Sequence, residues 1–180
     1  VLLHGPQGVG KTVLTRAALD RLNRQQPTPS AHVHCMNKYE EFLAGERHGD
    51  VAIFLHADAN AELEDLAAAG IETDDGAFIV IDGEQGRSVF QTATGRDPVG
   101  LASEARENES HVEADLTGGE CPSDEDESSD HFSKYIFAFS EAQNEAVDGI
   151  YAEGDVMHAY VVCNCGTTYA DKWLLDERDA

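Results

Sequence analysis

The sequence predicts an α/β protein in two parts: a short βα(β) segment at the front and a mixed α+β acidic domain behind it. At the front, the apolar residues Val1–Leu3 lead through a glycine-rich loop into a helical pattern over Lys11–Leu22. The charge also changes sign near residue 35. Residues 1–35 carry 4 − 1 = +3, whereas residues 36–180 carry 8 − 34 = −26. A change this abrupt indicates two segments of different origin or role.

Hydrophobic periodicity predicts the individual elements. Runs of four to eight apolar or alternating residues indicate strands, and apolar residues spaced three or four apart indicate helices. The predicted strands are Val1–His4, Ala31–Cys35, Asp50–Leu55, Ala77–Ile81, Lys134–Phe139, Val156–Cys163 and Tyr169–Leu175, the last pairing with the one before it. The predicted helices are Lys11–Leu22, Lys38–Ala44, Ala59–Ala69, Arg87–Thr92 and Val99–Glu107.

An acidic low-complexity stretch interrupts the second part. It centres on Pro122-Ser-Asp-Glu-Asp-Glu-Ser-Ser-Asp130 and predicts a loop. We therefore divide the chain into a P-loop-like segment (1–37, partial), an α/β acidic domain (38–107), the acidic loop (108–131) and a β-rich part of the acidic domain (132–180).

The amino-acid composition limits the classes of function that this chain could have. There are 35 Asp and Glu against 12 Lys and Arg, with a net charge of −23 and a pI near 4.4. Such an excess is typical of proteins kept in molar salt, which screens the self-repulsion; an acidic interaction protein of ordinary cytosol is the alternative. The charge disfavours nucleic-acid binding by this chain, because phosphate contacts need clustered positive charge. Four cysteines and no membrane-length apolar run favour a cytoplasmic protein without a membrane contact.

The front loop matches a phosphate-binding motif in full. Gly5-Pro-Gln-Gly-Val-Gly-Lys-Thr12 satisfies G-x-x-x-x-G-K-[ST], and it lies between a predicted strand and a predicted helix. Glycines let backbone N–H groups turn toward an anion, and the helix N-terminus adds partial positive charge. Lys11 is expected to reach the β- and γ-phosphates of ATP, and the Thr12 hydroxyl is expected to bind Mg²⁺. The predicted nucleotide-binding residues are Gly5, Gln7, Gly8, Val9, Gly10, Lys11 and Thr12.

Two stretches resemble known families. Val1–Leu22, together with Ala31–Cys35, resembles the start of the AAA+ core of archaeal origin-recognition ATPases, which implies ATP binding and an ancestry in the initiation of DNA replication. Residues 38–180 resemble an uncharacterised acidic domain family of halophilic archaea. That second resemblance rests on Glu41-Phe-Leu-Ala-Gly-Glu-Arg47, Asp115-Leu-Thr-Gly-Gly-Glu-Cys121, Tyr151-Ala-Glu-Gly-Asp155 and Cys163-Asn-Cys-Gly-Thr-Thr-Tyr-Ala-Asp-Lys-Trp173. It implies no particular activity.

Hydrolysis of ATP would also need an acid at the end of an apolar strand. Ala77-Phe-Ile-Val-Ile-Asp82-Gly-Glu84 is the best candidate, with Asp82 and Glu84 as the catalytic residues; Asp58 is a second. Gly83 separates the two acids, whereas the AAA+ pattern has them adjacent. The plainer alternative is a strand that leaves the sheet through an Asp-Gly turn.

Cys163-Asn-Cys165-Gly resembles half of a zinc-ribbon knuckle. Cys121 is the third predicted ligand, and His131 and His158 are further candidates for a closed site of four ligands; Cys35 is more distant in sequence. The alternative is two ordinary thiols on one face of a strand.

Three hypotheses follow. The first is a nucleotide-binding protein, a P-loop ATPase if it is active. The second is a non-enzymatic halophilic domain of unknown function and unknown protein partner that carries a truncated or fused P-loop fragment. It predicts a core of Phe54, Ile79, Phe137, Tyr160 and Trp173. The third is a zinc-dependent interaction module, which requires Cys121, Cys163 and Cys165 to converge.

Overall fold

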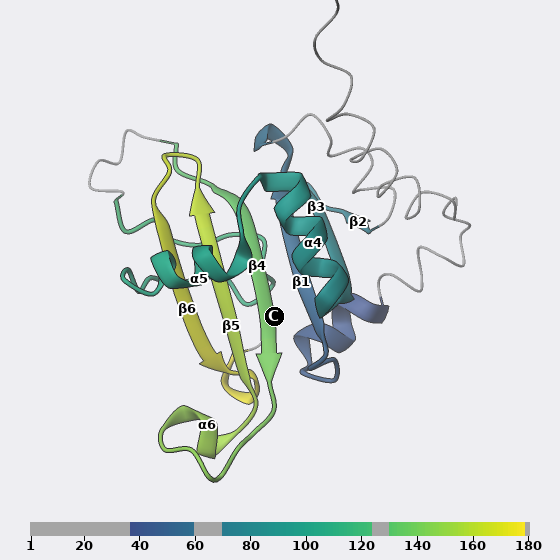
Figure 1. Ribbon diagram of the computed structural model, residues 1–180, viewed down its shortest axis with the longest axis vertical. Helices are drawn as coiled ribbons and strands as arrows, with labels where there is room; N and C mark the ends of the chain where they lie inside the picture. Colours follow the sequence, from purple (N-terminus) through teal and green to yellow (C-terminus); the bar gives the residue numbers. More distant parts are fainter. Residues whose placement is uncertain (1–36, 60–69, 124–129, 179–180) are drawn as a thin grey trace, which may run out of the picture.

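A six-stranded antiparallel sheet organises the structure, a computed structural model that describes residues 37–59, 70–123 and 130–178. The strand order is β2-β3-β1-β4-β5-β6 (Figure 1). The strands are β1 (Asp50–His56), β2 (Ile71–Glu72), β3 (Gly76–Asp82), β4 (Ser133–Glu141), β5 (Val156–Cys163) and β6 (Thr168–Leu174).

The pairing of β1 with β4 joins the two halves of the acidic region into one sheet. Ile53 on β1 faces Ile79 on β3 and Phe137 on β4 in the strand register. Residues 50–82 and 133–174 therefore share one set of backbone hydrogen bonds. All eight residues of β5 are buried, because the sheet is covered on both faces at its centre.

Two helices cover one face of the sheet. α4 (Gly83–Thr94) follows β3 directly, and the Asp82 side chain caps it by accepting hydrogen bonds from the backbone N–H groups of Glu84 and Gln85. Gly95 ends the helix with a φ of +72°, a conformation that glycine adopts without steric cost. α5 (Pro98–Ala105) begins with Asp97 as its cap and proline in its first turn.

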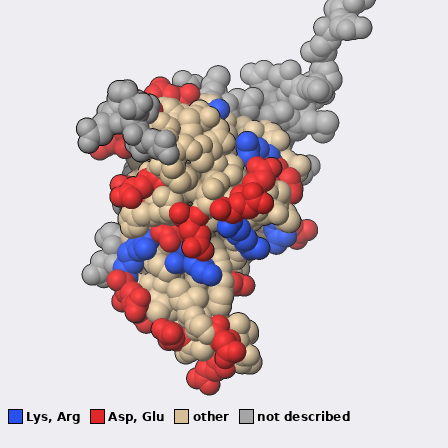
Figure 2. All heavy atoms as spheres, turned by 90° about the vertical axis from the view of Figure 1, so that its left-hand side faces the viewer, with Lys and Arg blue, Asp and Glu red and all other residues tan. Residues whose placement is uncertain are grey.

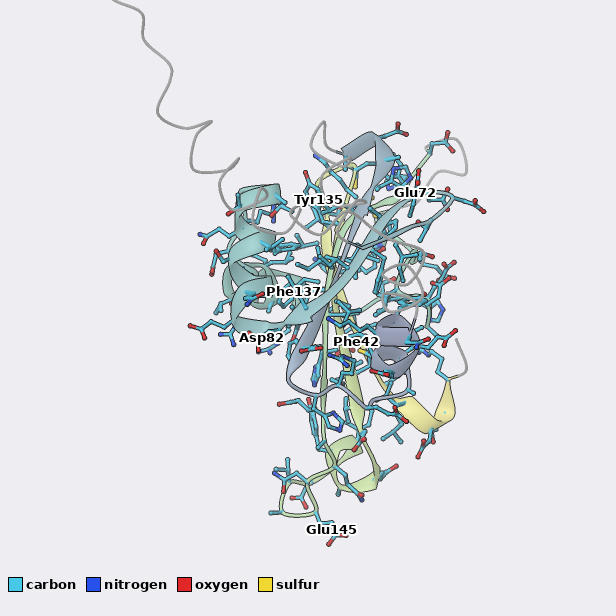
Figure 3. The ribbon with its side chains drawn as sticks, turned by 90° about the vertical axis from the view of Figure 1, so that its right-hand side faces the viewer. Phe42, Glu72, Asp82, Tyr135, Phe137 and Glu145 are labelled. Atoms are coloured by element: carbon cyan, nitrogen blue, oxygen red, sulfur yellow. The ribbon has the colours of Figure 1, made fainter. Side chains whose placement is uncertain are left out.

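The opposite face carries a helix over 37–43 and the irregular segment 106–123. Figure 3 views the sheet nearly edge-on, with Phe42 on one side and Phe137 beside α4 on the other. The segment first runs along the outer edge of β6, where Ala170 N donates to Asn108 O and Ser110 N donates to Ala170 O. Val112 and Leu116 then pack into the core on the Phe42 side.

The five predicted core residues are all at least 95 % buried, on the two faces of the sheet. Phe54 and Trp173 belong to the cluster under Phe42, whereas Ile79, Phe137 and Tyr160 pack under α4 and α5. The core is therefore two apolar layers separated by the sheet.

Most predicted elements between residues 38 and 175 are present within two to four residues of their expected bounds. The structure is mixed α/β, as the sequence predicts, but its sheet is antiparallel throughout. Four short elements in the described residues were not expected: β2, α6 (Ile150–Glu153) and two 3₁₀ helices, η1 (Ala57–Ala59) and η2 (Leu175–Glu177). Pieces of two to four residues carry no periodic pattern. The predicted P-loop segment and most of the helix expected over Ala59–Ala69 lie outside the described residues. No P-loop fold is present in the described ranges.

Candidate metal centre

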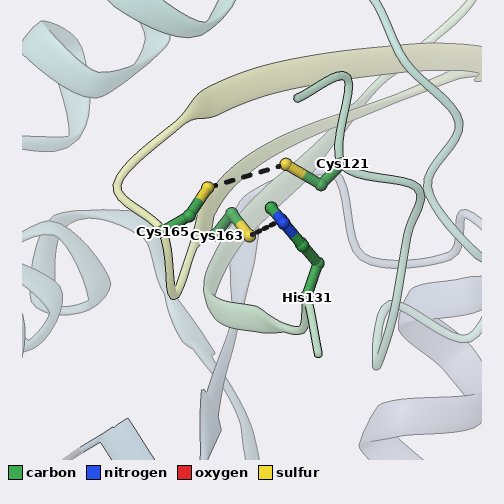
Figure 4. A group of neighbouring side chains, drawn as sticks. All are labelled: Cys121, His131, Cys163 and Cys165. Atoms are coloured by element: carbon green, nitrogen blue, oxygen red, sulfur yellow. Dashed lines mark hydrogen bonds between the residues drawn. The ribbon is translucent and has the colours of Figure 1, made fainter. Parts of the chain in front are cut away.

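Three separate segments bring together, at one end of the sheet, four side chains that could bind a metal ion. Cys163 is the last residue of β5, and Cys165 lies in the turn that leads to β6. Cys121 comes from the irregular segment after α5, and His131 lies two residues before β4. Figure 4 shows the four side chains pointing toward one another.

The spacing of the ligand atoms suits a tetrahedral ion. All four ligand atoms lie within 4.8 Å of one another. Cys121 Sγ lies 3.8 Å from Cys165 Sγ, and Cys163 Sγ lies 3.4 Å from His131 Nδ1. A tetrahedral Zn²⁺ with bonds of about 2.3 Å to sulfur and about 2.0 Å to nitrogen separates two sulfurs by about 3.8 Å, and a sulfur from a nitrogen by about 3.5 Å. These two separations match the tetrahedral values, and the four residue types are compatible with zinc.

The turn between β5 and β6 positions the two hairpin thiols. Cys163 N donates to Thr167 O, and Gly166 N donates back to Cys163 O at 2.9 Å. Gly166 has a φ of +97°, which favours glycine. Because the chain reverses so tightly, both cysteines reach the cluster: Cys163 from the end of β5 and Cys165 from the turn that follows it.

Asn164 ties the hairpin turn to the segment that carries His131. Its amide nitrogen donates to Asp130 O at 2.8 Å, and its amide oxygen accepts from Phe132 N at 3.3 Å. Its backbone N–H also donates to Phe132 O at 3.0 Å. These contacts flank His131 on both sides and hold its backbone against Cys163.

The two hairpin cysteines differ in their electrostatics. Burial raises the pKa of Cys163 to about 12, since its side chain lies in the core. Desolvation also acts on Cys165, but hydrogen bonds with Thr167, Cys163 and Cys121 outweigh it and lower its pKa to about 6. The cluster thus includes an exposed thiol that ionises near neutral pH, and thiolate is the form that binds metals.

The three cysteines predicted as ligands, Cys121, Cys163 and Cys165, are brought together, and His131 is the fourth member of the cluster. His158, the other candidate, lies elsewhere on the sheet, where its Nε2 is 2.8 Å from Glu141 Oε2. Sequence periodicity does not show whether His131 or His158 is the fourth ligand. His131 joins the cluster because β4 begins beside the β5–β6 turn.

The predicted hydrolytic residues occupy a different place. Asp82 ends β3, and its Oδ1 accepts from Glu84 N at 3.0 Å and from Gln85 N at 3.4 Å. Glu84 is exposed in the first turn of α4. The carboxylate of Asp82 therefore caps a helix. Its proposed partners Gly5, Gln7, Gly8, Val9, Gly10, Lys11 and Thr12 all lie outside the described residues.

The fold and the site together define a class of protein: an antiparallel α/β domain with a Cys₃His cluster at one end of the β5–β6 hairpin, which forms an edge of the sheet. Residues 70–176 match a family model described as "Family of unknown function (DUF5807)". The match spans more than half of the chain, so the protein belongs to this family. It includes all four cluster residues and excludes the front loop. No curated protein and no solved structure matches the sequence. In the described ranges, no helix has both the length and the apolar character to span a bilayer.

Proposed function

We propose that the protein is a zinc-binding domain in which Cys121, His131, Cys163 and Cys165 hold one Zn²⁺. The observation that carries the proposal is the convergence of four ligand atoms within 4.8 Å from three separate segments. Three thiols and one imidazole are a common donor set for zinc.

The proposed zinc is structural. Four protein ligands complete a tetrahedral shell and leave no position for a water or a substrate, which is the arrangement of structural sites. The ion would join the loop at Cys121 and the segment at His131 to the β5–β6 hairpin, all at one end of the sheet. Zinc would thus substitute for apolar packing where the loops are polar and exposed.

Cobalt titration of the reduced, metal-free protein tests the site. Co²⁺ in a tetrahedral thiolate site gives intense visible absorption, and Zn²⁺ should displace it stoichiometrically because zinc is preferred in such sites. His131→Gln should weaken the cobalt spectrum and the affinity. His111→Gln is the matched control, since His111 is a half-exposed histidine outside the cluster. An identical spectrum for both variants would exclude His131 as a ligand.

Nucleotide binding is a second candidate function, and the full G-x-x-x-x-G-K-T match at Gly5–Thr12 favours it. We propose that Lys11 and Thr12 hold ATP and Mg²⁺, and that this segment is a remnant of an AAA+ ATPase of replication initiation. The zinc proposal is independent of it. The alternative remains a halophilic domain with a fused loop fragment that has no function of its own.

Titration of a fluorescent ATP analogue with Mg²⁺ in molar KCl tests this second function. Saturable binding by the intact chain that is lost in Lys11→Ala would support a working phosphate loop. Hydrolysis should then be tested with Asp82→Asn and Glu84→Gln. Absence of binding by a folded chain would leave only the zinc proposal.

A further inference from the structure

A cavity of about 550 Å³ lies between α5, the start of α4 and the sheet, and no residue of the cysteine cluster lines it. Phe137, Phe139 and Tyr160 form its aromatic wall. A second cavity of about 520 Å³ adjoins it and shares Arg106 and Tyr160. We call the first cavity the aromatic pocket. Its volume lies within the range of sites for small organic ligands.

The aromatic wall is built by the register of two neighbouring strands. Phe137 on β4 faces Tyr160 on β5, and Phe139 faces His158 one step along, so all four rings lie on the same face. The ring centroids of Phe139 and Tyr160 are 6.1 Å apart. On the opposite wall, Val99 of α5 is 66 % exposed, an unusual exposure for a large aliphatic side chain. The pocket therefore offers apolar surface on both sides of a planar ring.

The two arginines that line the pocket have no carboxylate partner within ion-pair distance among the described residues. Arg106 donates from Nη2 to the Tyr160 hydroxyl at 3.1 Å, and Arg87 donates only to the carbonyl of Gly83 at 3.3 Å. Neither forms an ion pair with a carboxylate of the described residues. Asp50, the acid that lines the pocket, is already paired with Arg47 at 2.6 Å.

This concentration of free cations is notable in a chain of net charge −23. Arg47, Arg96 and Arg178 each pair with a carboxylate. Figure 2 shows that Lys and Arg side chains on one face gather mainly in a band across its middle, with acidic side chains around them. Two guanidinium groups that form no ion pair with the described residues line the aromatic pocket, and they favour a ligand that supplies negative charge.

We propose that the aromatic pocket binds a small organic anion that carries a planar aromatic ring. The ring lies against Phe139, the partly exposed ring of the aromatic wall, and the anionic group meets Arg106 and Arg87. A carboxylate or a phosphate ester has the required chemistry, so the ligand is an aromatic carboxylate or a nucleoside monophosphate. The surrounding acids exclude a long nucleic-acid strand, because each further phosphate would meet negative charge.

Binding of 8-anilinonaphthalene-1-sulfonate, a fluorescent aromatic anion, tests the proposal. The Lys11→Ala chain is used throughout, so that the front loop cannot contribute. We expect saturable binding at one site, with Kd raised about tenfold by Arg106→Gln or Arg87→Gln, as for the loss of one charge-assisted contact. Arg96→Gln is the matched control, because Arg96 pairs with Glu104 and does not line the pocket. Circular dichroism checks that each variant is folded.

Competition distinguishes the two sources of ligand. Displacement by benzoate alone identifies an aromatic carboxylate, and displacement by AMP but not adenosine identifies a nucleoside monophosphate. Equal displacement by AMP and adenosine, or by AMP and inorganic phosphate, would overturn the proposal, since the anion or the ring would then be unnecessary. So would equal Kd values for Arg87→Gln, Arg106→Gln and Arg96→Gln in folded protein.

Discussion

Asn164 acts at the residue scale by joining two segments that each carry a proposed zinc ligand. Its side chain contacts the backbone of Asp130 and Phe132, on either side of His131, and it lies between Cys163 and Cys165 in sequence. A side chain of this kind does not bind the metal. It fixes where the imidazole lies before the metal arrives, which lowers the entropy that binding must otherwise overcome.

We predict that Asn164→Ala weakens zinc affinity about tenfold without changing the number of zinc ions bound, because contacts of this kind typically contribute 10–100-fold. Competition with a chromophoric chelator measures the affinity. Asn144→Ala is the control: Asn144 sits in an exposed turn, where its side chain accepts from Ala146 N. Equal affinities for the two variants would show that the hairpin contacts do not position His131.

His158 is a second residue whose environment predicts a measurable property. Burial lowers the pKa of His158 from 6.5, and Arg106 and Lys172 act in the same direction; the Glu141 carboxylate opposes them. The imidazole is therefore neutral near pH 7. As the pH falls below about 6.5, the unfolded chain binds a proton before the folded protein does, so the free energy of unfolding decreases.

We predict that His158→Gln makes the free energy of unfolding fall less between pH 7 and 5.5 than in the wild type. The difference over this range is at most about 1.4 kcal/mol, because pH 5.5 lies one unit below the ordinary histidine pKa of 6.5. Urea titrations across this range measure it. His111→Gln is the control for replacing a histidine at a half-exposed position. A His158→Gln slope equal to that of the wild type would contradict the lowered pKa.

At the scale of elements, the junction of β3 and α4 shows how one short sequence supports two interpretations. An apolar run that ends in an acid is expected both for a hydrolytic strand and for a strand followed by a capped helix. In this structure the Asp82 carboxylate accepts hydrogen bonds from two backbone N–H groups in the first turn of α4. The residues after Asp82 favour the capped helix over the hydrolytic strand, because they form α4, which packs on β1 and β3.

We predict that Asp82→Ala lowers the free energy of unfolding by about 1 kcal/mol, the usual contribution of an N-cap side chain. Chemical denaturation measures this, and Glu84→Ala, an exposed change in the same turn, should have a smaller effect. Unchanged stability of Asp82→Ala, combined with loss of ATP hydrolysis, would favour the catalytic role instead.

Strand positions in this protein follow from local pattern, whereas strand partners do not. β5 coincides with its predicted span, since its eight residues alternate in the manner of a strand. The strands that pair with β1 could not be predicted in this way. β1 pairs with β4, which lies about 80 residues further along the chain, and no periodicity encodes such a contact. The same holds for the metal centre. The C-x-C pair is visible in the sequence, but the approach of His131 depends on the completed sheet.

At the scale of the whole molecule, the sheet brings distant segments together at two sites on different parts of the protein. The end of the β5–β6 hairpin gathers the thiols, and the face under α5 gathers aromatic rings and arginines. Apolar packing stabilises the sheet from both sides. Cys165, in the turn between β5 and β6, is exposed, so the proposed zinc would tie this turn to the packed core and contribute stability there.

Native mass spectrometry of the intact chain, purified with its metal, tests the zinc proposal most directly. We predict one zinc ion per chain, its loss in Cys163→Ser, its retention in Cys35→Ser, and a lower melting temperature after removal by a chelator. Cys163→Ser is informative because Cys163 is the most buried ligand. A folded chain that carries no zinc, or that keeps one zinc ion in Cys163→Ser, would contradict the proposed centre.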